Sequence, residues 1–259
     1  MISHSYLSEL FSLDGRVAVV TGGSSGIGKA IAGALARAGA SVVIVARKEA
    51  ELMATVEELA AVGCRVARVS GDLSTRTGVR AAAERAVEAF GEPDILVNCA
   101  GINLRPPMSE LSEDDWDTTM AVNLDAPFLL GQRFGPGMAE RGYGRIIHIT
   151  SQQAHRAFVR SGAYGVSKGA LESLARSQAE EWSPHGVTCN TLVPGFVPTP
   201  LNTRLSSDPE KVAALAARTL TGRNGLPDDF AGAAVFLAGR SAGYITGQSL
   251  FVDGGFSVH

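Results

Sequence analysis

A tyrosine and a lysine four residues apart are the side chains of this sequence best suited to proton transfer. Tyr164 and Lys168 open an alanine-rich helical pattern, and positions four apart lie on one helix face with about 5–6 Å between Cβ atoms. Free tyrosine titrates near pH ~10 and free lysine near ~10.4, so neither is an efficient acid or base at neutrality. Because a neighbouring cation favours phenolate, we expect Lys168 to lower the pKa of Tyr164 toward the useful range. Ser151, a short loop upstream, adds a second hydroxyl.

A glycine-rich turn near the start of the chain offers a place for phosphate. The β-branched run 16–21 predicts a buried strand, and a helical pattern begins at residue 29. The glycines between them have the spacing Gly-x-x-x-Gly-x-Gly rather than the usual Gly-x-Gly-x-x-Gly. Such a turn lets the backbone approach a pyrophosphate at a helix N-terminus. The predicted nucleotide-binding residues are Gly22, Ser24, Ser25, Gly26, Ile27 and Gly28.

The end of the second predicted strand indicates which dinucleotide is bound. An acidic residue there binds the ribose 2′-hydroxyl of NAD, whereas an arginine suits the 2′-phosphate of NADP. The strand ends Ala46-Arg47-Lys48, without an acid. Arg47 can bind a phosphate as a bidentate fork, with Ser24 as a neutral donor. We therefore expect NADP(H) at Arg47 and Lys48, with NAD(H) as the alternative.

Strands and helices alternate along the whole chain and must position these residues. Strand patterns occur at 16–21, 41–46, 66–70, 94–98, 144–150, 186–193 and 249–252, with helical patterns between them. This alternation predicts a parallel sheet with helices on both faces. We expect a single α/β domain over residues 1–259, Rossmann-like and doubly wound, with a seven-stranded sheet. A segment at about 196–225, with a helix expected at 209–220, interrupts the pattern and is predicted to be a lid.

The composition argues against several classes of protein. A net charge of −3 gives no basic field for nucleic acid or an anionic membrane. Cys64, Cys99 and Cys189 form no CxxC motif, which favours a reducing compartment and argues against structural zinc, and no other spacing predicts a metal. No apolar run reaches ~18 residues and residues 1–13 show no signal peptide. We expect a cytoplasmic protein.

Taken together, the motifs resemble those of the short-chain dehydrogenases/reductases. The resemblance rests on Thr21-Gly22-x-x-x-Gly26-x-Gly28, Asn98-Cys99-Ala100-Gly101, Asn123, Ser151, Tyr164-x-x-x-Lys168 and Pro194-Gly195. Each motif is weak alone, whereas the ordered set, from about Leu13 to Gly255, is specific. Cys99 is a departure, since the family more often has a second Asn there. We expect little consequence, because Ala100 and Gly101 are kept.

The resemblance implies a role for each matching residue. Tyr164 would exchange a proton with the substrate oxygen, Lys168 would lower its pKa and bind the nicotinamide ribose, and Ser151 would bind the substrate oxygen. Asn123 would hold a water that completes a proton relay. The other implied cofactor contacts are Asp72, Leu73, Asn98, Ala100, Gly101, Pro194, Gly195, Val197 and Thr199. The implied reaction is NAD(P)-dependent interconversion of a secondary alcohol and a ketone.

Basic side chains near the expected pocket suggest the kind of substrate. They are Arg105, His155, Arg156 and Arg160. Guanidinium groups recognise carboxylate and phosphate, so we hypothesise a sugar acid or another anionic or polyhydroxylated substrate. The run Gly101-Ile102-Asn103-x-Arg105 looks most like the gluconate 5-dehydrogenase-like members of the family.

Two alternatives remain open, and the assembly can also be predicted. The 3-oxoacyl-carrier-protein reductases resemble this sequence almost as closely, and an acidic carrier protein would also meet basic loops. A non-catalytic dinucleotide-sensing protein is disfavoured, because it has no use for a poised phenol.

The segment 243–255 resembles the part that family tetramers pack across a two-fold axis. An open apolar edge strand would be an aggregation hazard, so we expect a homotetramer.

Overall fold

The computed structural model describes residues 4–259, which form one seven-stranded parallel sheet. The strands lie in the order β3-β2-β1-β4-β5-β6-β7. Their bounds are β1 Val17–Thr21, β2 Ser41–Ala46, β3 Val66–Ser70, β4 Ile95–Asn98, β5 Gly144–Ile149, β6 Val187–Pro194 and β7 Ser249–Val252. The chain order reverses between β1 and β4, where sheets of this kind open a crevice for a ligand. The predicted fold class and all of the predicted strands are confirmed.

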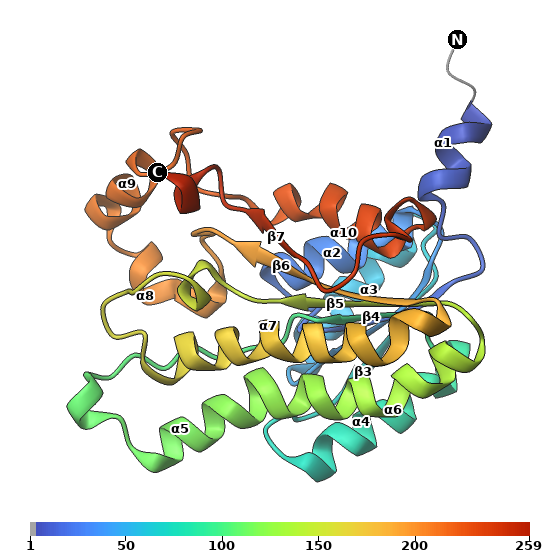
Figure 1. Ribbon diagram of the computed structural model, residues 1–259, viewed down its shortest axis with the longest axis horizontal. Coiled ribbons are helices and arrows are strands. Elements are labelled where there is room, and N and C mark those ends of the chain that lie inside the picture. Colours follow the sequence, from blue (N-terminus) through green and yellow to red (C-terminus); the bar gives the residue numbers. More distant parts are fainter. Residues whose placement is uncertain (1–3) are drawn as a thin grey trace.

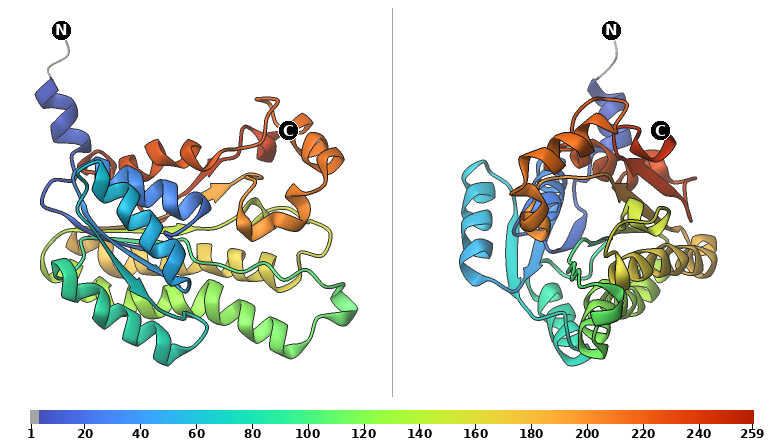
Figure 2. Two further views of the ribbon diagram at one scale, coloured as in Figure 1. Left: turned by 180° about the vertical axis from the view of Figure 1, so that it is seen from behind. Right: turned by 90° about the vertical axis from the view of Figure 1, so that its left-hand side faces the viewer.

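Two layers of helices cover the sheet (Figures 1 and 2). One layer contains α2 (Gly26–Arg37), α3 (Glu49–Ala61) and α10 (Ala231–Ala238). The other contains α4 (Arg76–Phe90), α6 (Ala126–Glu140) and α7 (Gly162–Trp182). A short helix, α5 (Glu113–Met120), runs into α6 through a π-helical turn at Ala121–Asp125. The 3₁₀ turns are Met108–Glu110, Gln152–Ala154, Ser183–His185, Pro200–Asn202, Pro227–Phe230, Arg240–Ala242 and Phe256–Val258.

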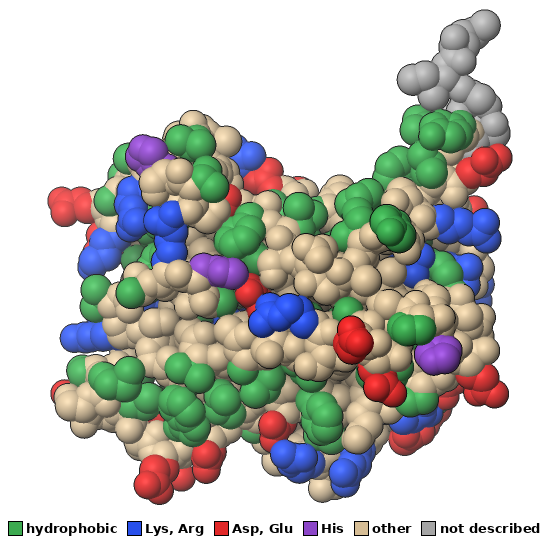
Figure 3. Space-filling view, in the orientation of Figure 1, with side chains coloured by type: hydrophobic (Ala, Val, Ile, Leu, Met, Phe, Trp, Pro, Cys, Tyr) green, Lys and Arg blue, Asp and Glu red, His purple; other side chains and the backbone are tan. Residues whose placement is uncertain are grey.

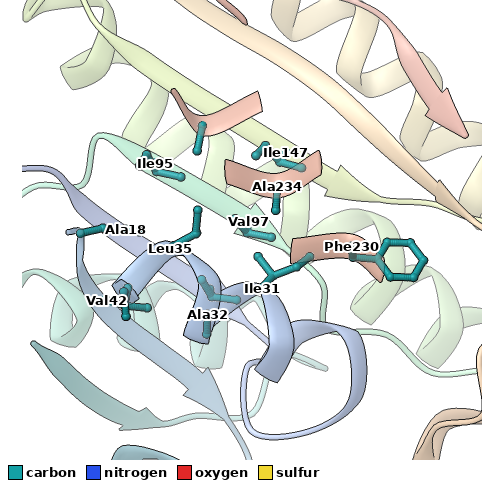
Figure 4. Close-up of a cluster of buried hydrophobic side chains, with 14 of the residues drawn as sticks. Ala18, Ile31, Ala32, Leu35, Val42, Ile95, Val97, Ile147, Phe230 and Ala234 are labelled. Carbon is teal, nitrogen blue, oxygen red and sulfur yellow. The ribbon is translucent and has the colours of Figure 1, made fainter. Parts of the chain in front are cut away.

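Alternate residues of each central strand enter the two cores. Ala18 and Val20 pack with α2 and α10, whereas Val19 faces the layer of α4, α6 and α7. Figure 4 shows the first of these cores, in which Val97 of β4 lies beside Ile31 of α2. A parallel strand buried on both faces reads as a continuous apolar run. This is why the strands were recognisable from the sequence.

The structure differs from the sequence prediction mainly in short helices. Helix α1 (His4–Phe11), which projects from one end of the molecule, and α8 (Thr203–Ser206) were not predicted. In the insertion, α9 spans Pro209–Ala217 rather than 209–220. Helices this short are marginal on their own and form through tertiary contacts, so local sequence signals them poorly. Across residues 4–259, no helix combines the length and apolar character needed to cross a membrane.

Candidate active site

The glycine-rich turn joins β1 to α2 and leaves the N-terminus of α2 accessible. Gly22 and Gly26 have φ angles of +68° and +52°, which side chains disfavour. A Cβ atom on Gly28 would overlap the carbonyl oxygen of Gly22, so this position has no room for a side chain. Ser25 precedes the helix and makes no side-chain capping bond. The first-turn N–H groups are therefore available for an anion such as a pyrophosphate.

A cavity of about 390 Å³ lies at this end of the sheet. Most of the residues expected to contact the cofactor line it: Gly22, Ser24, Ser25, Gly26, Ile27, Gly28, Arg47, Lys48, Asp72, Leu73, Ala100, Gly101 and Thr199. Its other lining residues, which were not predicted as cofactor contacts, are Val45, Ala46, Glu51, Gly71, Cys99, Ile102, Asn103, Val122, Pro200 and Leu201. The residues present fit a dinucleotide with its pyrophosphate at α2.

Charged side chains at the end of β2 are partly paired. Lys48 Nζ lies 2.7 Å from Glu51 Oε1, and both residues line the cavity. The pKa of Asp72 is held below its usual value, first by hydrogen bonds from the backbone and side chain of Ser74 and to a lesser degree by the charge of Arg47. Because Ser74 binds the Asp72 carboxylate, Arg47 keeps donors for an incoming phosphate.

Ser151, Tyr164 and Lys168 come together at the adjoining edge, as the sequence predicted. Ser151 follows β5, and the other two lie on the first turns of α7. Their exposures are 7%, 6% and 4%, so all three are buried. Lys168 Nζ lies 5.6 Å from the Tyr164 ring centroid and donates to the Ile149 carbonyl at 2.8 Å. The lysine is thereby fixed beside the phenol.

The sequence predicted a lowered pKa for Tyr164, and this prediction is wrong for the protein without a ligand, in which the pKa is raised. Burial raises the pKa of Tyr164 to about 12, although the Ser151 hydroxyl and the charge of Arg105 each lower it in part. Burial likewise lowers the pKa of Lys168 to about 8. For both groups desolvation outweighs the neighbours that favour the charged form, because both lose water when buried. Tyr164 therefore keeps its proton at neutral pH.

Arg105 lies near Tyr164, where sequence reasoning had placed only a substrate contact. Its Nε donates to Asn103 Oδ1 at 3.1 Å and its Nη1 to the Val159 carbonyl at 3.3 Å. Burial lowers its pKa, the charge of Tyr164 opposes this, and the cation Arg204 reinforces it. Arg204 belongs to α8 in the insertion and was not predicted. A second cation, from a separate segment, thus lies near Arg105.

The other three basic residues expected at the substrate all lie in the loop that follows Ser151. Arg156 donates to the carbonyls of Ser257 and His259. Arg160 is exposed and has a φ angle of 57°. His155 Nε2 lies 2.9 Å from the carboxylate of the buried residue Glu172. His155 and Arg156 thus contact other parts of the chain and Arg160 is exposed, and a substrate contact at these three residues stays a prediction.

Asn98 also departs from its expected place in the cofactor cleft. Its side chain is buried and its Nδ2 donates to His148 Nδ1 at 3.1 Å. His148 Nε2 in turn lies 2.8 Å from Gln178 Oε1, so the imidazole carries its proton on Nε2. The neighbouring Cys99 lines the cleft instead, and a Cβ atom on Gly28 would lie 3.3 Å from its Sγ. The departure at Cys99 therefore places a thiol against the glycine-rich turn.

Asn123 lies in the π-helical turn, a feature frequent at functional sites. Its Nδ2 donates to the Ile102 carbonyl at 3.0 Å and to Ser167 Oγ at 3.1 Å, and its Oδ1 accepts from the Ile102 N–H at 2.9 Å. Both side-chain N–H groups are therefore used. A relay water at Asn123, which stays a prediction, would have to be held by its oxygen atoms.

Four residues at and after the end of β6 were expected to contact the cofactor, and only one of them, Thr199, lines the cavity. Pro194, Gly195 and Val197 do not line it, whereas Thr199, Pro200 and Leu201 do. Val197 is 3% exposed and packs in the core. Its carbonyl accepts from Asn202 Nδ2 at 2.9 Å. This contact orders the base of the insertion, which places Thr199 against Gly26.

Known proteins share this arrangement over nearly the whole chain. A family profile described as Enoyl-(Acyl carrier protein) reductase matches residues 22–257. The gluconate 5-dehydrogenase of Gluconobacter oxydans is 38% identical over 250 residues, which cover 96% of this chain and 98% of that protein. The chain belongs to the short-chain dehydrogenase/reductase family. The resemblance inferred from the ordered motifs is confirmed.

Two solved structures of family members carry the same fold with NADP bound. A gluconate 5-dehydrogenase from Burkholderia cenocepacia, in complex with NADP and tartrate, has a TM-score of 0.92 at 38% identity and covers 98% of this chain and 99% of its own. A 3-oxoacyl (acyl-carrier-protein) reductase from Agrobacterium tumefaciens, with NADP bound, has a TM-score of 0.92 at 36% identity and covers 98% and 100%. This short-chain dehydrogenase/reductase is an NAD(P)-dependent oxidoreductase.

Proposed function

We propose that the protein interconverts a secondary alcohol and a ketone on a sugar acid, with NADP(H) as the cofactor. Arg105 carries the substrate part of this proposal. Its guanidinium is partly buried near Tyr164, yet within residues 4–259 it forms no ion pair with a carboxylate. A desolvated cation of this kind favours an anionic ligand. The relatives named for gluconate and crystallised with tartrate support a hydroxy acid.

The residues of the buried cluster divide the work of the reaction. When bound, the cofactor supplies or accepts the hydride at the substrate carbon. In the reducing direction, Tyr164 gives its proton to the carbonyl oxygen, and Ser151 donates a hydrogen bond to the same atom. Lys168 donates to the Ile149 carbonyl and would hold the nicotinamide ribose of a bound cofactor. In the oxidising direction, the proton returns to the phenol.

The preference for NADP(H) rests on the cations at the end of β2. Arg47 and Lys48 line the cavity together with Ser24, and no acidic residue ends the strand. A guanidinium fork matches a 2′-phosphate. Because Glu51 pairs with Lys48, we propose a moderate preference in which NAD(H) also binds.

We further propose a cytoplasmic homotetramer with a mobile lid at 196–225. β7 is one of the two edge strands of the sheet, and its Leu250 is 39% exposed, which supports pairing with a copy of itself. The insertion lies over the end of the sheet that carries the cavity (Figure 2). Solution scattering should give the mass of four chains, and a monomeric mass at micromolar concentration would contradict the assembly.

A substrate panel with a matched pair of variants tests the proposal. Turnover at 340 nm is measured for gluconate and related sugar acids with NADP⁺, for neutral polyols with NADP⁺ and for acetoacetyl thioesters with NADPH. Arg105→Met should raise the KM for the acid by about 10- to 100-fold, the equivalent of one charged hydrogen bond. It should change the KM for a neutral polyol little. Arg80→Met, on the exposed face of α4, is the control.

The outcomes separate the candidate substrates. An unchanged KM for every acid in Arg105→Met rejects the sugar-acid proposal. Faster turnover of thioesters than of any sugar acid would favour a 3-oxoacyl-carrier-protein reductase, whose solved relative is as similar in fold. Lys and Arg side chains gather at the end that carries α8 and α9 (Figure 3), and they would suit an acidic carrier protein as well as a small anion.

A further inference from the structure

We propose that the C-terminal segment 253–259 is a positioning element for the substrate side of the active site. It touches both of the segments that border the substrate: the loop 152–161, which follows Ser151, and the insertion 196–225. No residue of 253–259 lines the cavity, so the segment would act through these neighbours. The inference rests on the proposed function, because it assumes that substrate binds between these two segments.

Contacts to the loop 152–161 come from the last turn of the chain. Arg156 donates to the carbonyls of Ser257 and His259. The ring of Phe158 stacks on that of Phe256, with centroids 6.0 Å apart and planes inclined by 21°. Arg156 and Phe158, two residues of the same loop, are therefore both held by residues 256–259.

The same turn also contacts the insertion. The Arg218 guanidinium lies 4.2 Å above the Phe256 ring centroid, and the N–H of Thr221 donates to the Gly254 carbonyl at 3.1 Å. The Phe256 ring, which is 2% exposed, thus contacts Phe158 of the loop and Arg218 of the insertion. Figure 1 shows the C-terminus beside α9. A single aromatic side chain couples two segments that are far apart in sequence.

The segment is itself held in a defined turn. The Asp253 carboxylate accepts from the N–H of Gly255 at 2.9 Å and from that of Ser257 at 2.8 Å. Gly254 and Gly255 have φ angles of +64° and +83°, which glycine adopts without strain. A preformed turn is a better support than a loose tail, because little ordering entropy is lost when the loops dock on it.

The effect on the site would pass through Arg105 and the wall of the cavity. Arg105 donates to the carbonyl of Val159 in the loop, so displacement of the loop moves the guanidinium that is near Tyr164. The insertion carries Arg204 and the lining residue Leu201. Small displacements of such groups are costly, since about 1 Å can change a rate by roughly 100-fold. The glycine-rich turn makes no comparable contact with 253–259, so cofactor binding should be spared.

Three variants remove contacts of the segment 253–259: two of them act on the bonds of Arg156, and the third acts on the contact between Arg218 and Phe256. Deletion of 257–259 removes the acceptors of Arg156 and leaves Phe256 in place; Arg156→Met removes the donor; Arg218→Met removes the cation from the ring. In each, kcat/KM for the substrate should fall roughly 10-fold, whereas the Kd for NADPH should stay within about twofold. Arg156→Met combined with the deletion should lose no more than the deletion alone, because the deletion already removes both acceptors of Arg156.

Hydrogen exchange of the NADPH-bound protein gives a readout that needs no substrate. Each variant should speed amide exchange in both 152–161 and 209–225, whereas Arg218→Lys, which keeps a cation over the ring, should restore the wild-type rates. Arg80→Met should change neither. Unchanged exchange, or faster exchange in only one segment, would overturn the inference. If wild-type protein turned over nothing in the substrate panel, the proposed function would fail, and the exchange result would still decide this inference.

Discussion

The cofactor side and the substrate side of this site are held together by different kinds of contact. On the cofactor side, main chain and one short side chain pack closely against main chain: a Cβ atom on Gly22, in the turn after β1, would lie 2.8 Å from the Ala100 nitrogen, in the turn after β4. Thr21 Oγ1 accepts from the N–H groups of Cys99 and Ala100, each at 3.1 Å. On the substrate side, long side chains join loops that are far apart in sequence, as in the bonds from Arg105 to Val159 and from Arg156 to Ser257.

The difference explains why the cofactor is easier to infer than the substrate. Backbone packing around glycines tolerates almost no substitution, so it leaves a motif that can be read. Side-chain contacts between surface loops can be exchanged without altering the sheet. Two family members with different names, for gluconate and for a 3-oxoacyl carrier protein, accordingly have the same TM-score of 0.92 to this chain. Fold does not decide the substrate.

The largest expected effect is on turnover, at Tyr164, which lies where the cofactor side and the substrate side meet. Tyr164→Phe removes the proton donor and should reduce kcat by about 10²- to 10⁴-fold, with little change in the Kd for NADPH. Tyr244→Phe is the control, since that side chain is fully exposed. Steady-state kinetics and fluorescence titration of the cofactor measure the two quantities. Loss of cofactor binding together with turnover would show that the phenol is mainly structural.

Acid should destabilise the cofactor side through His148. Burial lowers the pKa of this imidazole to about 4, so between pH 6.5 and 4 the unfolded chain binds more protons than the folded one. Stability is therefore fully present above pH 6.5 and is lost as the pH falls toward 4, by up to about 3 kcal/mol. Urea unfolding at both pH values measures the loss.

A matched pair of variants attributes that loss. His148→Gln should flatten the dependence on pH, whereas His185→Gln, at an exposed position, should keep it. If the free energy of unfolding depended on pH equally in the two variants, the acid sensitivity would arise from a residue other than His148.

Backbone packing on the cofactor side can be tested with one methyl group. Gly28→Ala should weaken NADPH binding by about 10- to 100-fold, because the added Cβ would overlap the Gly22 carbonyl and push the turn apart. Gly232→Ala, in α10, meets no atom within 4 Å and should bind NADPH normally. If Gly28→Ala bound the cofactor as the wild type does, the turn would be more compliant than its contacts indicate.

The smallest expected effect concerns the choice between cofactors. Arg47→Ala should weaken NADP⁺ binding roughly 10-fold and leave NAD⁺ little changed, the equivalent of one charged hydrogen bond. Glu51→Gln should shift the preference the other way by a few-fold, because it releases Lys48 from its exposed ion pair. The ratio of kcat/KM values for the two cofactors measures both. A shift in the same direction for both variants would reject this role for Glu51.

Local sequence determined the parts of this protein whose physics is local. Strands such as β1 are continuous apolar runs, Gly22 and Gly28 stand where only glycine fits, and Tyr164 and Lys168 share a helix face because of helical periodicity. From these the parallel sheet, the dinucleotide site and the clustering of Tyr164 with Lys168 could be predicted before the structure was known.

Tertiary structure decided what depends on burial and on distant contacts. The Tyr164 pKa rises because the phenol is desolvated, which the spacing to Lys168 cannot reveal. Asn98 turns toward His148 rather than the cleft, and Arg156 binds Ser257, a residue about a hundred positions later. A free energy set by desolvation or by the meeting of remote loops is a property of the packed chain, so no local pattern records it.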